Sequence, residues 1–159
     1  MAESILNGKR ILIVDDEPDI LAVVEEGILL SCPNCTIDKA ANYEKGAQLL
    51  DANSYDVVIL DIMGVRGFDL LEIAVKRKFR VAMLTGHALN PEALAKSHDM
   101  GAMAYIPKDK IGELVPFLED VLTNDYKTGW KRLMDKLEAY LNARWEKDWK
   151  TKTNIAYWY

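Results

Sequence analysis

The chain has 159 residues, of which 50% are hydrophobic and 28% are charged, and its formal net charge is −5. This length favours one domain with an appendage, and this apolar content excludes a largely disordered chain. No apolar run is long enough for a transmembrane helix, and the first residues lack the basic-then-apolar pattern of a signal peptide. We therefore expect a cytoplasmic location.

The charge is unevenly distributed along the chain. Residues 1–122 contain 12 Lys and Arg against 20 Asp and Glu, whereas residues 123–159 contain 8 against 5. All four Trp also lie in the second segment. This change in composition predicts a main domain over residues 1–122 and a separate tail over residues 123–159. The acidic character of the main domain argues against binding to nucleic acid.

Five apolar stretches follow one another along the chain, and each precedes a stretch with apolar residues at helical spacing. Continuous apolar runs are typical of strands that are buried on both faces of a parallel sheet. We therefore expect an α/β fold with five β-α units, in which helices cover both faces of the sheet. The expected strands are residues 9–14, 36–41, 57–60, 80–86 and 102–106.

Several helix starts are marked by residues with strong positional preferences. Pro18 and Pro91 suit the first turn of a helix, and Asn42 is a predicted N-cap. Pro116 must lie in the first turn of the fifth helix, which places the start of that helix near residues 112–113.

Polar side chains follow four of the expected strands: Asp15, Asp16, Asp61, Thr85 and Lys108. Because the carboxyl ends of parallel strands meet at one edge of a sheet, we expect these side chains to converge. Clustered carboxylates repel each other, and Mg²⁺ prefers carboxylate, water and phosphate oxygens. Lys108 offers a positive charge for a phosphate, and Thr85 offers a hydroxyl donor. Together they predict phosphoryl transfer to Asp61, with its carboxylate as the nucleophile.

Four motifs make residues 9–122 similar to the receiver domain of bacterial two-component response regulators. The motifs are Ile11–Glu17, Val57–Asp61, Met83–Gly86 and Gly101–Lys108. The resemblance implies a doubly wound, flavodoxin-like sheet with strand order 2-1-3-4-5. It also implies a phosphoacceptor switch that is not a conventional enzyme. Its expected partners are a sensor histidine kinase or phosphotransfer protein and a downstream protein target.

The resemblance assigns roles to the residues of the predicted site. Asp61 is the phosphoacceptor, which receives a phosphoryl group from the phosphohistidine of a kinase. Asp16 binds Mg²⁺ directly, Asp15 binds it through water or orients it, and the backbone carbonyl of Met63 is a further ligand. Lys108 pairs with the phosphate.

The resemblance also implies a switch pair. Thr85 moves to bond a phosphoryl oxygen, and Tyr105 swings inward as the space beside Thr85 changes. The physical basis is a two-state element that a new dianion and its hydrogen bonds shift.

Two features depart from the family pattern. The family usually has a Met-Pro pair after the acceptor and reaches its loop glycine eight residues on. Here no proline follows Met63, and Gly67 is six residues after Asp61, so the loop looks two residues short. Asp109 replaces the usual proline after Lys108, and we expect a trans bond because a cis bond would cost about 2.5–4 kcal/mol. The alternative to a working switch is a degenerate pseudo-receiver that acts as an interaction module without phosphorylation.

The tail carries apolar and aromatic residues at spacings of three and four over residues 125–150, which predicts an amphipathic helix of about seven turns. We expect the apolar stripe to pack on the main domain or on a second copy of the chain, as a homodimer. Docking onto a kinase or target protein is an alternative, and acids on the polar face argue against a membrane surface. The tail is too short for a winged-helix DNA-binding domain. Residues 151–159 are expected to form a frayed end.

Cys32 and Cys35 form a single CxxC pair. The sequence has no second pair and only two histidines to complete a zinc site. The pair also follows a helical pattern, whereas the CxxC pair of a thioredoxin-like protein opens a helix. We expect two loop residues without a chemical role, and a thiol sensor is the alternative.

Overall fold

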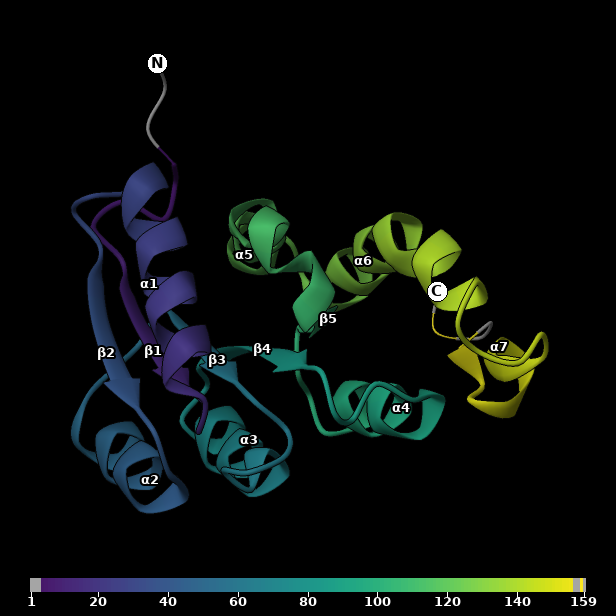
Figure 1. Ribbon diagram of the computed structural model, residues 1–159, viewed down its shortest axis with the longest axis horizontal. Coiled ribbons are helices and arrows are strands. Elements are labelled where there is room, and N and C mark those ends of the chain that lie inside the picture. The colour runs from purple at the N-terminus through teal and green to yellow at the C-terminus, as the bar shows by residue number, and fades with distance from the viewer. Residues whose placement is uncertain (1–3, 156–157, 159) are drawn as a thin grey trace.

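The computed structural model describes residues 4–155 and 158, and its core is a five-stranded parallel sheet (Figure 1). The strands lie in the order β2-β1-β3-β4-β5, as the resemblance implied. Their bounds are β1 Arg10–Val14, β2 Thr36–Ala40, β3 Val57–Leu60, β4 Arg80–Thr85 and β5 Ala104–Pro107. The predicted flavodoxin-like α/β fold is therefore confirmed.

Helices cover both faces of this sheet (Figure 1). On one face lie α1 (Pro18–Ser31) and α5 (Leu114–Thr123), and on the other lie α2 (Tyr43–Ala52), α3 (Gly67–Lys76) and α4 (Pro91–Asp99). A 3₁₀ helix, η1 (Lys108–Glu113), precedes α5, and α6 (Tyr126–Asn142) and α7 (Trp149–Lys152) follow it. The middle strand β3 is entirely buried, which explains its continuous apolar run. Within the described residues, no helix combines the length and apolarity needed to cross a membrane.

The predicted helix starts agree closely with the structure. Pro18 is the first residue of α1, and the side chain of Asn42 accepts a 2.8 Å hydrogen bond from the backbone of the third residue of α2. Pro116 lies in the first turn of α5, as expected. This helix begins at Leu114 and not at residues 112–113, because η1 occupies the preceding positions.

The last strand is shifted from the predicted residues 102–106. The backbone N–H of Ala102 donates a 2.9 Å hydrogen bond to the carbonyl oxygen of Ser97, so this residue belongs to the turn that follows α4. At the other end, Pro107 pairs in register with Thr85 and extends β5 by one residue. The expectation was wrong at both ends, because the apolar run starts before the sheet pairing and the pairing continues through Pro107.

The tail is not the single helix predicted over residues 125–150. α6 ends at Asn142, and residues 143–148 turn the chain before α7 begins. The Oδ1 atom of Asn142 accepts a 2.9 Å hydrogen bond from Nε1 of Trp149, whose side chain is 1% exposed. The turn thus brings the indole of Trp149 back onto the end of α6, where it is buried.

The end of the chain also differs from the frayed segment that was expected over residues 151–159. Ile155 is buried, and the ring of Trp158 stacks on the ring of His98 in α4 with the ring centroids 3.5 Å apart. Residues 156, 157 and 159 lie outside the described residues.

α6 directs its apolar stripe towards the receiver-like core. The Nε1 atom of Trp130 donates a buried 2.9 Å hydrogen bond to the carbonyl oxygen of Ala102, just before β5. The buried residues of the helix are Gly129, Trp130, Leu133, Met134, Leu137 and Leu141. The structure therefore supports packing on the same chain. A homodimer, a protein partner or a membrane could use this stripe only if α6 left its place.

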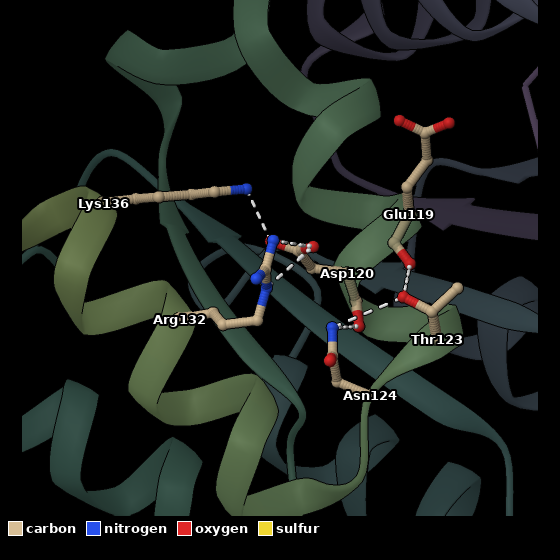
Figure 2. A network of polar contacts seen from close by, with 6 residues as sticks. All are labelled: Glu119, Asp120, Thr123, Asn124, Arg132 and Lys136. Atoms are coloured by element: carbon tan, nitrogen blue, oxygen red, sulfur yellow. Dashed lines mark hydrogen bonds and ion pairs between the residues drawn. The ribbon is translucent and has the colours of Figure 1, made fainter.

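A polar network joins α6 to the end of α5 (Figure 2). The carboxylate of Asp120 accepts a 2.5 Å hydrogen bond from Nζ of Lys136 and lies 3.2 Å from Nη2 of Arg132. The side-chain amide of Asn124 donates a 3.0 Å hydrogen bond to the backbone carbonyl of Asp120. Burial alone would raise the pKa of Asp120, but the bonds from Lys136 and Arg132 outweigh burial and lower the pKa. The network thus stabilises the docked position of α6.

The two cysteines are free thiols at the end of α1. Cys32 donates a 2.8 Å hydrogen bond to the carbonyl oxygen of Ile28, and Cys35 donates one of 2.8 Å to that of Leu6. Burial raises the pKa of Cys32 to about 12, so this thiol is protonated at neutral pH and is a poor nucleophile. These contacts support a packing role.

Replacing Trp130 by Phe should lower the free energy of unfolding by about 1–3 kcal/mol, because the buried carbonyl of Ala102 loses its donor. Urea unfolding followed by circular dichroism measures the change. Trp145→Phe is the matched control, since Trp145 is only partly buried and should cost less. Equal losses in the two variants would contradict the role of the Trp130 hydrogen bond.

Candidate functional site

Two adjacent strands bring three carboxylates together. Val14 of β1 pairs with Leu60 of β3, so the next residues, Asp15 and Asp61, leave the sheet at the same level. Asp16 follows directly, and ligand oxygens of the three carboxylates lie within 4.8 Å of one another. Asp15 and Asp61 are buried, whereas Asp16 is exposed. The structure therefore places the three predicted acids in one cluster.

Lys108 enters this cluster from the edge strand, directly after β5. Its Nζ atom lies 2.9 Å from Oδ2 of Asp15 and 3.5 Å from Oδ1 of Asp61. It also donates a 2.6 Å hydrogen bond to Oε2 of Glu17. The Lys108 side chain is 11% exposed, so one largely buried ammonium faces three carboxylates.

Glu17 is the site residue that the sequence reasoning missed. It follows the two acids of the first motif, and this position was the only available signal. In the structure its backbone N–H donates a 2.9 Å hydrogen bond to Oδ1 of Asp15, while its carboxylate binds Lys108. The hydrogen bond from Lys108 lowers the pKa of Glu17. Glu17 therefore competes with Asp61 for the ammonium.

Burial and mutual repulsion disfavour the ionised form of Asp61. Burial raises the pKa of Asp61 to about 7, and Asp15 adds to the rise while Lys108 opposes it. Burial also raises the pKa of Asp15. Burial lowers the pKa of Lys108, but its contacts with the carboxylates of Glu17 and Asp15 outweigh this effect and raise the pKa overall. The cluster thus holds more negative charge than Lys108 alone balances.

Two buried carboxylate oxygens have a charge contact but no hydrogen bond. Oδ2 of Asp15 and Oδ1 of Asp61 lie near Nζ of Lys108, yet neither has a partner with hydrogen-bond geometry among the described residues. Buried oxygens of this kind usually have a partner. Oxygens of Asp15, Asp16 and Asp61 are ligands that a hard divalent cation prefers. The residues therefore fit the acidic triad of a Mg²⁺ site.

The loop after Asp61 is so tight that Gly67 lies against the backbone of Asp61. A Cβ atom at position 67 would be 2.0 Å from the carbonyl oxygen of Asp61, and the Gly67 N–H donates a 3.0 Å hydrogen bond to Ile62. Gly64 has a φ of 86°, and a Cβ atom there would be 2.4 Å from Oδ2 of Asp16. These two glycines allow the short loop to close over the acidic cluster.

The remaining expectations for this region have different outcomes. Met63 lies in the short loop with its side chain 53% exposed, and the role of its backbone carbonyl as a Mg²⁺ ligand stays a prediction. The peptide bond between Lys108 and Asp109 is trans, as predicted.

Thr85 and Tyr105 are fully buried and are connected through the loop that follows β4. Oγ1 of Thr85 accepts a 3.0 Å hydrogen bond from the backbone N–H of Ala88. The Tyr105 hydroxyl donates a 2.6 Å hydrogen bond to the carbonyl oxygen of Ala88 and accepts one of 3.1 Å from Asn90. Tyr105 is therefore buried, with its hydroxyl bound to the loop after β4. The switching role of this pair stays a prediction.

Comparisons with known proteins identify the class. Residues 11–119 match the family model of the response regulator receiver domain. The chain is 35% identical over 105 residues to the two-component response regulator ARR18 of Arabidopsis thaliana, a match that covers 64% of this chain and 16% of that protein. It is 31% identical over 107 residues to the transcriptional regulatory protein TcrA of Mycobacterium tuberculosis, covering 65% of this chain and 41% of TcrA. The chain thus matches less than half the length of these relatives.

A solved structure agrees with these matches. The CheY-like receiver domain protein from Methanospirillum hungatei JF-1 is 25% identical, with a TM-score of 0.57, and the match covers 82% of this chain and 94% of that one. Fold and site define a phosphoacceptor domain. The chain belongs to the response regulator receiver family.

Replacing Gly67 by Ala should lower the free energy of unfolding by at least about 1–3 kcal/mol, because the methyl group would meet the Asp61 carbonyl. The matched control is Gly27→Ala in α1, where no atom lies within 4 Å of the new methyl group. This control should gain about 0.5–1 kcal/mol from helix propensity. Urea unfolding measures both, and a Gly67→Ala protein as stable as wild type would rule out the close approach.

Replacing Asp61 by Asn should stabilise the protein in the presence of a chelator at about pH 8. The fold raises the pKa of Asp61 from 3.8 to about 7, so wild-type stability falls as the pH rises between these values. The fall could reach about 4 kcal/mol at roughly 1.4 kcal/mol per pKa unit, and Asn removes it. The gain should be largest above about pH 7 and small near pH 4. Urea unfolding at both pH values checks this, and an equal gain at both would show that ionisation is not the cause.

Proposed function

We propose that Asp61 accepts a phosphoryl group from the phosphohistidine of a sensor histidine kinase or a phosphotransfer protein, in a Mg²⁺-dependent reaction. The observation that supports this most is the buried carboxylate of Asp61, which lies beside two further acids and 3.5 Å from Nζ of Lys108. In this proposal residues 1–122 form the receiver domain and residues 123–159 a helical tail. The chain catalyses only its own phosphorylation and dephosphorylation.

The proposed transfer uses groups that already converge on one edge of the sheet. An oxygen of Asp61 attacks phosphorus in line with the P–N bond to the kinase histidine, and the imidazole keeps the electron pair as that bond breaks. The ammonium of Lys108 leaves the carboxylate of Glu17 and binds a phosphoryl oxygen. Water then solvates the carboxylate of Glu17, whose side chain is 46% exposed. When bound by Asp15, Asp16, Asp61 and the Met63 carbonyl, Mg²⁺ supplies neutralisation of phosphoryl charge.

The proposed response begins at Thr85. Its hydroxyl leaves the Ala88 N–H and donates to a phosphoryl oxygen, which frees the loop after β4. Tyr105 bonds the same loop through Ala88 and Asn90, so a movement of this loop also changes the surroundings of β5. The pair would thus convert a charge on Asp61 into a change of backbone position.

The proposed output is a protein contact. The acidic receiver region disfavours nucleic acid, and the tail helices pack on the receiver. We infer that the protein acts in the cytoplasm through a downstream protein target.

A degenerate receiver that works as an interaction module is the second candidate. Two observations support it: Glu17 holds Lys108 at 2.6 Å, and the loop after Asp61 is short. Neither removes the acceptor, an acid of the triad or the lysine, so we favour the phosphorylated switch.

Incubation with acetyl phosphate and Mg²⁺ should add the mass of one phosphoryl group to the protein, as measured by intact-mass spectrometry. Asp61→Asn should remain unmodified, and a chelator should prevent the modification of wild type. Asp69→Asn is the matched control, because it removes an exposed carboxylate on α3 and should leave phosphorylation unchanged. No mass gain in wild type would decide in favour of the degenerate receiver.

A further inference from the structure

α6 lies along β5 and reaches the phosphoacceptor end of this strand. The indole of Trp130 binds the carbonyl of Ala102 just before β5. Ten residues later along α6, about 15 Å at 1.5 Å per residue, the hydroxyl of Tyr140 donates a 2.7 Å hydrogen bond to Oδ2 of Asp109. Asp109 is the residue directly after Lys108. The tail therefore contacts Asp109, the sequence neighbour of the lysine that supplies the ammonium of the site.

Four side chains form this contact, which we call the Asp109 junction: Asp109, Lys110, Tyr140 and Arg144. The guanidinium of Arg144 lies 3.6 Å from the ring centroid of Tyr140, and its Nη2 atom is 3.9 Å from Oδ2 of Asp109. Nζ of Lys110 lies 5.2 Å from the same ring. Two cations thus lie near the ring of Tyr140 while its hydroxyl binds Asp109 at the start of η1.

On the other side of the junction, Lys108 holds two carboxylates at once. Its Nζ atom donates a 2.6 Å hydrogen bond to Oε2 of Glu17 and lies 3.5 Å from Oδ1 of Asp61. The backbone that carries this side chain continues directly into Asp109, so the ammonium and the junction are attached to adjacent residues.

We propose that α6 restrains the phosphoacceptor site through the Asp109 junction, and that phosphorylation of Asp61 loosens this junction. The inference rests on the proposed function and adds its internal regulator. The junction is formed while Lys108 binds Glu17, and the proposed restraint is that it holds Asp109, and with it the adjacent Lys108, in that arrangement. Coupling between two sites is reciprocal, so phosphorylation must weaken the junction by the same factor. Tyr140 and Arg144 are positioning residues, since they touch no reacting atom.

The exposure of the junction limits the size of this effect. The side chains of Asp109 and Arg144 are 71% and 43% exposed. Exposed polar pairs of this kind change an equilibrium by about two- to fivefold. The tail would therefore tune the affinity of the site and would not block it.

Titration of the full-length protein with beryllofluoride, a phosphoryl mimic, in the presence of Mg²⁺ measures the restraint, with binding followed by fluorine NMR. Tyr140→Phe keeps the ring beneath Arg144 and removes the bond to Asp109. It should bind beryllofluoride about two- to fivefold more tightly than wild type. Glu146→Gln is the matched control, because Glu146 pairs with Lys152 inside the tail and should leave the affinity unchanged. An unchanged or weaker affinity in Tyr140→Phe would overturn the proposal.

A double-mutant cycle separates this contact from general loosening of the tail. Asp109→Ala removes the acceptor of this bond and should tighten binding as Tyr140→Phe does, and the double variant should show no further gain. Independent, additive gains from the two substitutions would show that they do not act through a common contact, and the proposal would fail.

Tryptophan emission reports the reverse direction of the coupling, because all four Trp lie in the tail. Saturating beryllofluoride should change the emission of wild type and leave that of Asp61→Asn unchanged. Fluorine NMR that shows binding without any change in emission would overturn the coupling and leave the proposed function intact. No bound fluorine signal, together with no phosphoryl mass gain, would overturn the proposed function, and the coupling with it.

Discussion

The ammonium of Lys108 is the charge that allows Asp15 and Asp61 to be buried side by side. Two carboxylates at adjacent strand ends would otherwise repel each other where water hardly reaches them. The sheet order places β4 between β3 and β5, and the long lysine side chain crosses that distance. The same ammonium is shared with Glu17, so the charge balance of the site depends on which carboxylate holds it. The loop glycines, the switch pair and the tail all lie near these charged groups.

The strands and the polar residues at their ends could be predicted because both depend on local pattern. A continuous apolar run that ends in an acid indicates a buried strand wherever it occurs, and residues 57–61 are the clearest case. Asn42 is a similar example, since an N-cap needs only its own side chain and the next turn of backbone. The strand order is different. Alternation of strands and helices predicts a parallel sheet, but the order 2-1-3-4-5 came from the family resemblance.

Contacts between distant residues could not be predicted in this way. Glu17 and Lys108 are separated by 91 positions, and no local pattern states that their side chains meet. The tail has the same limit. Its spacing of three and four continues beyond Asn142, yet the structure turns there and buries Trp149. The shortened loop after Asp61 was visible in the sequence, but the near contact of Gly67 with the acceptor's backbone required coordinates.

The position of α6 also affects how this protein meets other chains. The sheet has two outer strands, and they differ sharply: β2 shows exposed Thr36 and Lys39, whereas every residue of β5 is buried. A charged, partly exposed outer strand discourages pairing with another chain, and an apolar one invites it. Because α6 packs along β5, it covers the outer strand that is more prone to pair with another chain. Lifting the tail would therefore uncover a template for strand addition, so self-association and aggregation depend on how firmly this helix is held.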